Sequence, residues 1–283
     1  MALIDEFLSA KKAKGASEHT LSGYLDAWES FARWHEETTG LQIEPDTTSS
    51  LDAAEFRRHL QGSLKPSSVN TRLRQVKAVF AWAAETGLIE RDSLQEVRPL
   101  PEDDAPVRTL DRRTMAALLR EAQRGGGPRD VALYTLLAQT GLRIAEALAL
   151  TWDDLTIRER SGFVTVRKGK GGKRRTVPLT LTARIALLAW RDAAGAASGD
   201  PVFPIGARAV QKALSRYARR AGIEGKVTPH MFRHTFCKAL VDAGESLDRV
   251  AVLAGHASLN TTARYTKPTE KDLENAVSKL EWI

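Results

Sequence analysis

Four side chains near the carboxy end of the chain have the chemistry to grip a phosphate group and attack it. They are His230, Arg233, His256 and Tyr265. An arginine and two imidazoles can donate hydrogen bonds to an anion, and a phenol can serve as the nucleophile of a covalent reaction. Taken one at a time, the same residues have a plainer interpretation: two core histidines, a surface arginine and a packing tyrosine.

A predicted helix positions the first two of these residues. Thr228 and Pro229 are typical of a helix start, because a hydroxyl residue caps the first turn and a proline loses no hydrogen bond at the first helical position. His230 and Arg233 lie three residues apart, and this spacing places them on the same helix face. Gly244 is expected to end the helix.

The other two residues follow on shorter elements. A second helix is predicted from Leu247 to Leu253, and Gly255 stops it directly before His256. Tyr265 comes nine residues after that histidine, on a short segment that begins at Ser258. All four reactive side chains therefore belong to one stretch of forty residues.

Two stretches upstream add side chains that suit the same chemistry. In the first, Arg143 follows the helix-ending Gly141, and Glu146 lies three residues further on, where its carboxylate can hold the guanidinium by a bidentate contact. In the second, residues 168–175 form a basic, glycine-rich turn between two strand-like runs. Because the glycines permit a tight turn, we expect an antiparallel hairpin from Phe163 to Leu179.

Together these motifs resemble the tyrosine recombinase (integrase) family, and most closely its short Xer-like members. Each motif is weak alone, whereas five of them in one order and in suitable secondary-structure settings form a specific pattern. The pattern runs from T-G-L-R at Arg143 through a G-K-G lysine at Lys170 and P-H-x-x-R-H at His230 and Arg233 to G-H at His256 and a tyrosine at 265. The resemblance covers nearly the whole chain.

Phosphodiester cleavage gives the arginines and histidines their expected roles. Charge on the non-bridging oxygens must be matched in the transition state, and planar guanidiniums do this with paired N–H donors. Arg143 and Arg233 are expected to take that role, with Glu146 in support of Arg143. His230 and His256 are expected to act as hydrogen-bond donors or proton carriers.

The same reaction needs a nucleophile and an acid. Tyr265 is the expected nucleophile, and the other three tyrosines lack its setting: Tyr24, Tyr134 and Tyr217. Lys170, on the hairpin, is expected to protonate the leaving 5′ oxygen as general acid. Lys168 and Lys173 lie close enough in the sequence to leave this assignment open.

The predicted function is that of a site-specific DNA recombinase. As the resemblance implies, it would cleave and rejoin strands through a 3′-phosphotyrosyl intermediate and a Holliday junction, in a Xer-like, resolvase-like or integrase role. The expected partners are double-stranded DNA with a short inverted-repeat core site and three further copies of the chain, in a homo-tetramer on that DNA. A partner recombinase or an accessory protein is left open.

Two other functions fit parts of the pattern. A type IB topoisomerase-like enzyme would use the same cleavage chemistry and reseal the original strand without strand exchange. A non-catalytic DNA-binding protein would keep the fold as a clamp. The complete residue set argues against the second alternative.

No cofactor or metal is expected. Covalent catalysis conserves the bond energy in the phosphotyrosyl link, so no ATP is required. The chain has no GxxxxGK[ST] loop, and Asp153 with Asp154 is its nearest approach to a carboxylate cluster for magnesium. The single cysteine, Cys237, excludes an internal disulfide and is expected to be a small buried hydrophobe.

Composition and charge agree with a DNA-binding protein. No apolar run approaches the roughly 18 residues of a membrane span, and the amino terminus does not have the pattern of a signal peptide, so a cytoplasmic protein is expected. Residues 1–106 hold 12 Lys and Arg against 18 Asp and Glu, a net charge of −6. Residues 107–283 hold 30 against 17, a net charge of +13, which suits a polyanion.

The expected fold is mainly α with a small β-hairpin, in two domains that form a clamp around DNA, as the resemblance implies. Residues 1–97 are expected to form a helical, SAM-like core-binding domain, and residues 108–283 the catalytic domain. Between them, residues 98–107 contain three prolines and three acids, which favours an extended linker.

Four helices are expected in the first domain. Ser17 starts the second, and Pro66 starts the fourth, whose apolar residues leave a basic face. That face is either a solvated helix surface or a DNA contact, and its DNA-binding candidates are Lys65, Ser67, Asn70, Arg72, Arg74 and Lys77.

In the second domain, Asp111 is expected to cap a helix that breaks at residues 125–128 and continues to Thr140. Further helices are expected over 182–194 and 207–221. The DNA-binding candidates of this domain are Lys168, Lys173, Arg174 and Arg216. A last helix over 269–281 carries an apolar side, which either folds back on its own domain or, as the resemblance implies, docks into a neighbouring protomer.

Overall fold

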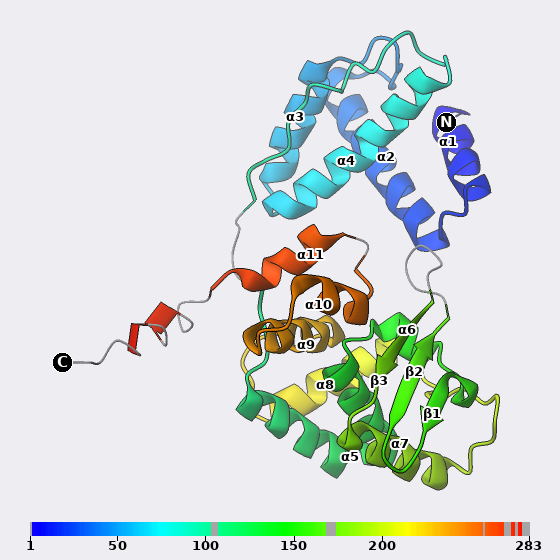
Figure 1. The fold of residues 1–283 in the computed structure, drawn as a ribbon. Coiled ribbons are helices and arrows are strands. Elements are labelled where there is room, and N and C mark those ends of the chain that lie inside the picture. Colours follow the sequence, from blue (N-terminus) through cyan, green and yellow to red (C-terminus); the bar gives the residue numbers. More distant parts are fainter. Residues whose placement is uncertain are drawn as a thin grey trace. The chain divides into compact units, whose positions relative to one another are not determined.

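A computed structural model describes residues 2–102, 107–167, 174–256 and 258–268, together with residues 273–274 and 277–278. The chain divides into two compact units, Met1–Asp104 and Ala105–Ile283 (Figure 1). The division falls within the segment that was expected to be a linker. The expected mainly helical fold with a small sheet is confirmed.

The first unit consists of four helices whose ends follow from local chemistry. Ser17 caps α2, since its hydroxyl accepts a hydrogen bond from the Thr20 N–H at 3.2 Å. Ser49 and Asp52 form a reciprocal capping box at the start of α3. A proline stands at the first position of the fourth helix, as expected. The bounds are α1 Ala2–Ala13, α2 Glu18–Thr39, α3 Ser50–Gln61 and α4 Pro66–Glu85.

Aromatic rings fill the core of this unit. Phe31 of α2 lies at the centre, with its ring centroid 5.0 Å from that of Phe56 on α3 and 6.3 Å from that of Phe80 on α4. All three side chains are fully buried. Each such burial contributes about 1.5–3 kcal/mol relative to an exposed ring, so these contacts help to hold the three helices together.

Asn70 on α4 does not have the exposed setting expected of a DNA contact. It is 3% exposed, its amide nitrogen donates to the Leu100 carbonyl at 2.9 Å, and its amide oxygen accepts from the Leu100 N–H at 2.7 Å. The same nitrogen donates to the Glu102 carboxylate at 2.7 Å. The side chain therefore fastens the segment that follows the bundle onto α4, and it has no free group for a phosphate.

Two further candidates on this helix bind protein groups. Lys77 donates to the carbonyls of Gln95 and Val97, both at 2.9 Å. Arg72 donates to the Ser30 hydroxyl at 2.8 Å. The remaining candidates of the first unit keep an accessible surface: Lys65 and Arg74 are exposed, and Ser67 is half-buried.

Replacing Asn70 by alanine should lower the free energy of unfolding of the first unit by about 1–3 kcal/mol, because the Leu100 N–H and carbonyl lose their partners in a buried place. Urea unfolding measures this change, and hydrogen exchange of the Leu100 amide should accelerate in parallel. Arg74→Ala on the exposed face of the same helix is the control. Equal stability of the two variants would contradict the fastening role.

The second unit begins with a broken helix, α5 (Arg112–Thr140). Asp111 caps it by accepting a hydrogen bond from the Thr114 N–H at 2.8 Å. The expected break is present at Gly127, whose φ of 69° leaves the helical region before Pro128 starts the second segment. That second segment is almost wholly buried.

A three-stranded antiparallel sheet belongs to the same unit, and its buried valines share one hydrophobic core with residues of α5. Its strands are β1 Leu155–Ile157, β2 Gly162–Val166 and β3 Arg175–Pro178, in the order β1-β2-β3. Val164 pairs with Leu155 on one side and with Val177 on the other. The hairpin of β2 and β3 was expected, whereas β1 was not, because three residues carry too little periodicity to predict a strand.

Helices α7, α8 and α9 pack against α5, whereas α10 packs against α9, and α11 against α10 (Figure 1). Tyr134 of α5 stacks on Phe232 of α9 with ring centroids 5.8 Å apart. Thr228 precedes α9 as expected, but its side chain makes no capping hydrogen bond. The bounds are α6 Ile144–Leu148, α7 Leu181–Ala194, α8 Ala207–Arg220, α9 Pro229–Asp242, α10 Leu247–Ala254 and α11 Leu259–Ala263.

Two predictions lie largely or wholly outside the described residues. The hairpin turn with Lys168, Lys170 and Lys173 is one, and most of the tail helix predicted over 269–281 is the other. Within the parts of the chain that are described, no helix is long and apolar enough to cross a membrane.

Candidate active site

The first arginine of the site is positioned by a glycine and a carboxylate. Gly141 ends α5 in the left-handed conformation, with a φ of 63°, and a Cβ there would lie 2.4 Å from the Phe236 ring. Two residues later, Arg143 is the N-cap of α6. Glu146 accepts from the Arg143 backbone N–H at 2.8 Å and from its guanidinium at 2.9 Å. One carboxylate thus caps the helix and orients the side chain.

A second arginine, which the sequence did not single out, binds the same carboxylate. Arg175 of β3 donates to the two Glu146 oxygens at 3.0 and 2.7 Å, and its Nε donates to the Leu253 carbonyl at 3.1 Å. The predicted DNA contact was its neighbour Arg174, which is exposed. Alternation along a strand decides between them, because a shift of one residue moves a side chain to the opposite face.

Glu146 is ionised at neutral pH. Burial acts to raise the pKa of its carboxyl, but the hydrogen bonds from Arg175 and Arg143 outweigh burial and hold that pKa below its ordinary value. The buried charge is therefore compensated by two guanidiniums.

The other predicted arginine, Arg233 of α9, is 2% exposed. Its Nη1 donates to the carbonyls of Gly141 and Ala254, at 2.8 and 2.6 Å. Its Nη2 is buried and makes no hydrogen bond to any described residue. An unpaired buried donor costs about 1–3 kcal/mol, so this nitrogen is a candidate contact for an anionic ligand.

The two arginines converge at the end of α10. Arg143 donates to the carbonyl of Gly255 at 3.1 Å, next to the Ala254 carbonyl that Arg233 binds. Gly255 has a φ of 69°, and a Cβ there would lie 2.7 Å from Nη1 of Arg175. Three guanidiniums thus approach one turn of backbone that only glycine accommodates.

The predicted histidines flank this turn. His256 follows Gly255, and its Nδ1 lies 2.8 Å from the Thr262 hydroxyl. Burial, followed by the charges of Arg233 and Arg143, lowers the pKa of His256 to about 4. His230 has an exposed edge, but the protein packed around the rest of its ring, followed by the charges of Arg233 and Arg143, lowers its pKa as well. Both rings are neutral at neutral pH.

The predicted nucleophile lies beside His256. Tyr265 belongs to a short 3-10 helix, Arg264–Thr266, and its ring stacks on the His256 ring with centroids 6.1 Å apart. Its hydroxyl lies 2.8 Å from Nδ1 of His234. Burial and the neighbouring thiol of Cys237 raise the pKa of this phenol.

The structure therefore brings six of the seven predicted catalytic and supporting residues into one region of the second unit: Arg143, Glu146, His230, Arg233, His256 and Tyr265. Lys170 lies outside the described residues. The sequence analysis missed Arg175, His234 and Thr262. A signal for His234 was available, since it lies four residues after His230 and hence on the same helix face.

Arg216, Asp153 and Asp154, which were also considered from the sequence, bind protein groups of the second unit. Arg216 on α8 is exposed and donates to the Tyr217 hydroxyl at 3.2 Å. The carboxylate of Asp154 binds Thr151 and Arg167, and that of Asp153 binds Ser198 and the Gly199 N–H. Both carboxylates are thus engaged by the protein.

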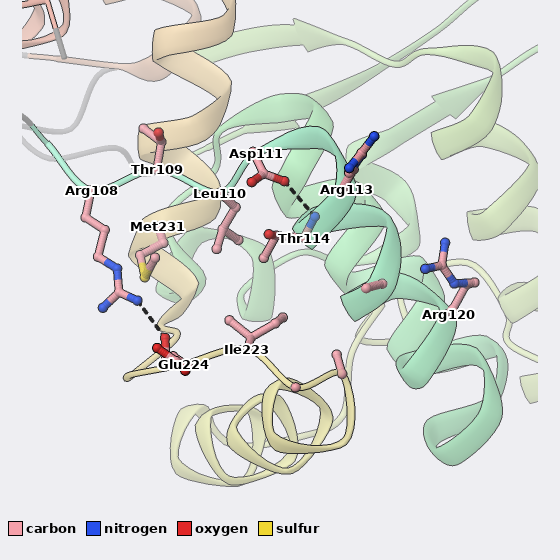
Figure 2. A pocket seen from close by; sticks show the side chains of 13 residues that line it. Arg108, Thr109, Leu110, Asp111, Arg113, Thr114, Arg120, Ile223, Glu224 and Met231 are labelled. Carbon is pink, nitrogen blue, oxygen red and sulfur yellow. Dashed lines mark hydrogen bonds between the residues drawn. The ribbon is translucent and has the colours of Figure 1, made fainter. Parts of the chain in front are cut away.

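A cavity of about 520 Å³ at the start of α5 is separate from these residues (Figure 2). Leu110, Ile223 and Met231 form apolar parts of its lining, and Arg108 donates to the Glu224 carbonyl at 2.8 Å at one end. None of the predicted catalytic side chains lines it.

Comparisons with known proteins identify the family of the chain. Residues 108–272 match the model of the phage integrase family, and residues 4–87 match its N-terminal SAM-like domain. The chain belongs to the phage integrase family. It is a site-specific recombinase of the tyrosine type, and the matches do not favour the topoisomerase alternative.

Tyrosine recombinases of the same family are similar to this chain over nearly its whole length. The tyrosine recombinase XerC of Xanthomonas axonopodis pv. citri (strain 306) is 33% identical over 94% of this chain and 92% of its own. The XerC of Neisseria meningitidis serogroup C (strain FAM18) is 32% identical over 94% and 90%. The chain thus resembles the Xer branch in sequence.

Solved integrase-family structures share the fold. XerH recombinase in a post-cleavage complex with a palindromic difH substrate is 23% identical, with a TM-score of 0.78 over 95% of this chain and 82% of that chain. A lambda integrase dimer bound to a COC′ core site is 17% identical, with a TM-score of 0.74 over 95% and 96%. At these identities the likeness shows the fold.

Replacing Glu146 by glutamine should lower the free energy of unfolding by about 3 kcal/mol, because the guanidiniums of Arg143 and Arg175 lose their buried counter-charge. The folded pKa of Glu146 is below its ordinary value of 4.5, so its contribution is complete above that pH and is lost as the pH falls through the folded value. Urea unfolding from pH 8 to pH 4 should show a constant difference that shrinks at the acid end.

Glu245→Gln is the matched control for this prediction. Glu245 pairs with Arg249 on the surface at 3.1 Å, and such an exposed pair contributes less than about 1 kcal/mol. If both variants were equally stable, Glu146 would not hold the arginines in the way described.

Proposed function

We propose that the chain cleaves DNA with Tyr265 as nucleophile and forms a 3′-phosphotyrosyl intermediate. The observation that carries the proposal is the convergence of Arg143 and Arg233 on the adjoining carbonyls of Gly255 and Ala254, beside the Tyr265 ring. Nη2 of Arg233 has no hydrogen-bond partner in the part of the chain that the structure describes. Guanidiniums held in this way cost no reorganisation when charge develops on a phosphate.

Each of these residues is proposed to act on a particular atom of the phosphodiester. The two arginines bind the non-bridging oxygens, and His230 and His256 donate hydrogen bonds or carry protons there. Tyr265 gives its phenolic proton to the neutral His256 ring beside it, and the bond from its oxygen to phosphorus forms while the bond from phosphorus to the 5′ oxygen breaks. Lys170 protonates that leaving oxygen as general acid. The covalent link conserves the bond energy, so rejoining needs no further reactant.

The DNA partner is proposed to be a duplex with a short inverted-repeat core, bound by a homo-tetramer in the cytoplasm. Support comes from the net charge of +13 over residues 107–283 and from relatives that were solved on core-site DNA. Strand exchange then proceeds through a Holliday junction. A partner recombinase or an accessory protein is compatible with the same site.

We also propose the domain roles. Residues 1–97 bind DNA, residues 98–107 link the domains, and residues 108–283 catalyse the reaction. The matches over 4–87 and 108–272 and the division after Asp104 support this assignment. Lys65, Arg74, Arg174 and Arg216 are its exposed candidates for phosphate contacts. The tail over 269–281 is proposed to support cooperative assembly.

A nicked suicide duplex tests the nucleophile. The wild-type chain should form a covalent protein–DNA adduct, and peptide mapping should place it on Tyr265. Tyr265→Phe should bind the duplex with unchanged affinity and form no adduct, because only the attacking oxygen is removed. Tyr24→Phe is the control and should form adduct at the wild-type rate. An adduct on the Tyr265→Phe variant would assign the reaction to another residue.

The unpaired nitrogen of Arg233 gives a second test. Arg233→Lys keeps the charge but loses the planar set of donors, so the cleavage rate should fall by about 10²–10³-fold. Arg184→Lys is the matched control, since Arg184 is also buried and binds the carbonyls of Leu179 and Glu159 away from the site. Single-turnover cleavage measures both, and equal rates would remove Arg233 from the reaction.

A further inference from the structure

The hydroxyl of Tyr265 is directed into the protein. The residue is 4% exposed, and its hydroxyl lies 2.8 Å from Nδ1 of His234. The thiol of Cys237, which is fully buried, lies against the same oxygen. His234 and Cys237 are three residues apart on α9 and therefore form one face of that helix. Together they enclose the phenolic oxygen.

Two of the groups that would bind a phosphate are more exposed to solvent than Tyr265. His230 is exposed, and the Arg143 side chain is 29% exposed. A duplex backbone can reach these groups from solvent, whereas it cannot reach a phenol that is enclosed by α9. Attack requires the oxygen to approach phosphorus to about 3–3.5 Å. The hydroxyl must therefore leave its place beside His234 before it can react.

We propose that His234 is a positioning residue that holds Tyr265 in an unreactive position, and that this hydrogen bond breaks before strand cleavage. The proposal rests on Tyr265 as the nucleophile. It assigns to His234 a restraint on the nucleophile, separate from the phosphate contacts of His230 and His256. The His230 and His234 rings touch edge to face, with centroids 4.4 Å apart. A phosphate bound at His230 would therefore lie close to the hydrogen bond between His234 and Tyr265.

The surroundings of His234 keep its ring neutral and hence able to accept the phenolic hydrogen. His230 lies on its own helix, Arg264 and His256 come from the segments packed against it, and Arg233 is its neighbour in sequence. Burial is the main cause that lowers the pKa of His234 to about 4, and the neighbouring His230 and Arg264 lower it further. A neutral acceptor and a neutral phenol form a hydrogen bond that shifts an equilibrium by about two- to tenfold.

The first experiment measures the contact in the DNA-free protein. N-acetylimidazole modifies accessible tyrosines, and peptide mass mapping reports each one. In His234→Phe, which keeps a ring but has no acceptor, acetylation of Tyr265 should accelerate about two- to tenfold. Tyr134 and Tyr217 are buried elsewhere in the same unit and should stay protected, which shows that the variant is folded. Unchanged protection of Tyr265 would overturn the proposal.

The second experiment measures single-turnover cleavage of the suicide duplex. His234→Phe should cleave about two- to tenfold faster at unchanged DNA affinity, because the nucleophile is released. His234→Asn places an amide where Nδ1 lies and should restore the wild-type rate, whereas His234→Gln reaches only the position of Nε2 and should behave like the phenylalanine variant. Slower or unchanged cleavage by His234→Phe would overturn the restraint.

Two controls distinguish a failure of the His234 restraint from a failure of the Tyr265 nucleophile assignment. If His234→Phe also exposed Tyr134 and Tyr217, His234→Gln would replace it in both measurements. If Tyr265→Phe still formed adduct, the nucleophile assignment would fail, and the acetylation experiment would still decide whether His234 holds the phenol.

Discussion

One buried carboxylate fixes the geometry on which the site depends. Glu146 binds the backbone and side chain of Arg143, which enters from the end of α5, and the guanidinium of Arg175, which enters from β3. A helical core and a small sheet are thereby joined at a single charge. Because a charge in such a place needs both partners, the positions of α6 and β3 are coupled, and with them the base of the hairpin that carries Lys170.

The glycines at the helix ends are the second constraint. At Gly141 and Gly255 the backbone turns left-handed where guanidinium or aromatic groups press against it. Arg233 reaches the carbonyls of both turns through one nitrogen, and its other nitrogen is buried without a partner among the described residues. Such an unmet hydrogen bond lowers the stability of the folded chain, and it lies at the site that we propose for the phosphate.

Much of this organisation could be predicted from the sequence, because helix caps and glycine stops are local signals. Ser17, Asp111 and Gly141 end or begin helices where they were expected to. Other features depend on tertiary context. Arg174 was predicted as a functional residue, whereas its neighbour Arg175 binds Glu146. Three residues were too few to predict β1. Nothing in the sequence around Asn70 indicated that its side chain would bind Leu100. The inward direction of the Tyr265 hydroxyl is a property of packing that no spacing encodes.

The contacts of Arg233 also bear on when the enzyme can first act during synthesis. Its partners lie 92 residues before it and 21 residues after it along the chain. A nascent chain on the ribosome therefore has no complete guanidinium site until the turn at Gly255 has been made and packed. A chain that ends before Ala254 therefore lacks part of the contacts that hold the Arg233 guanidinium.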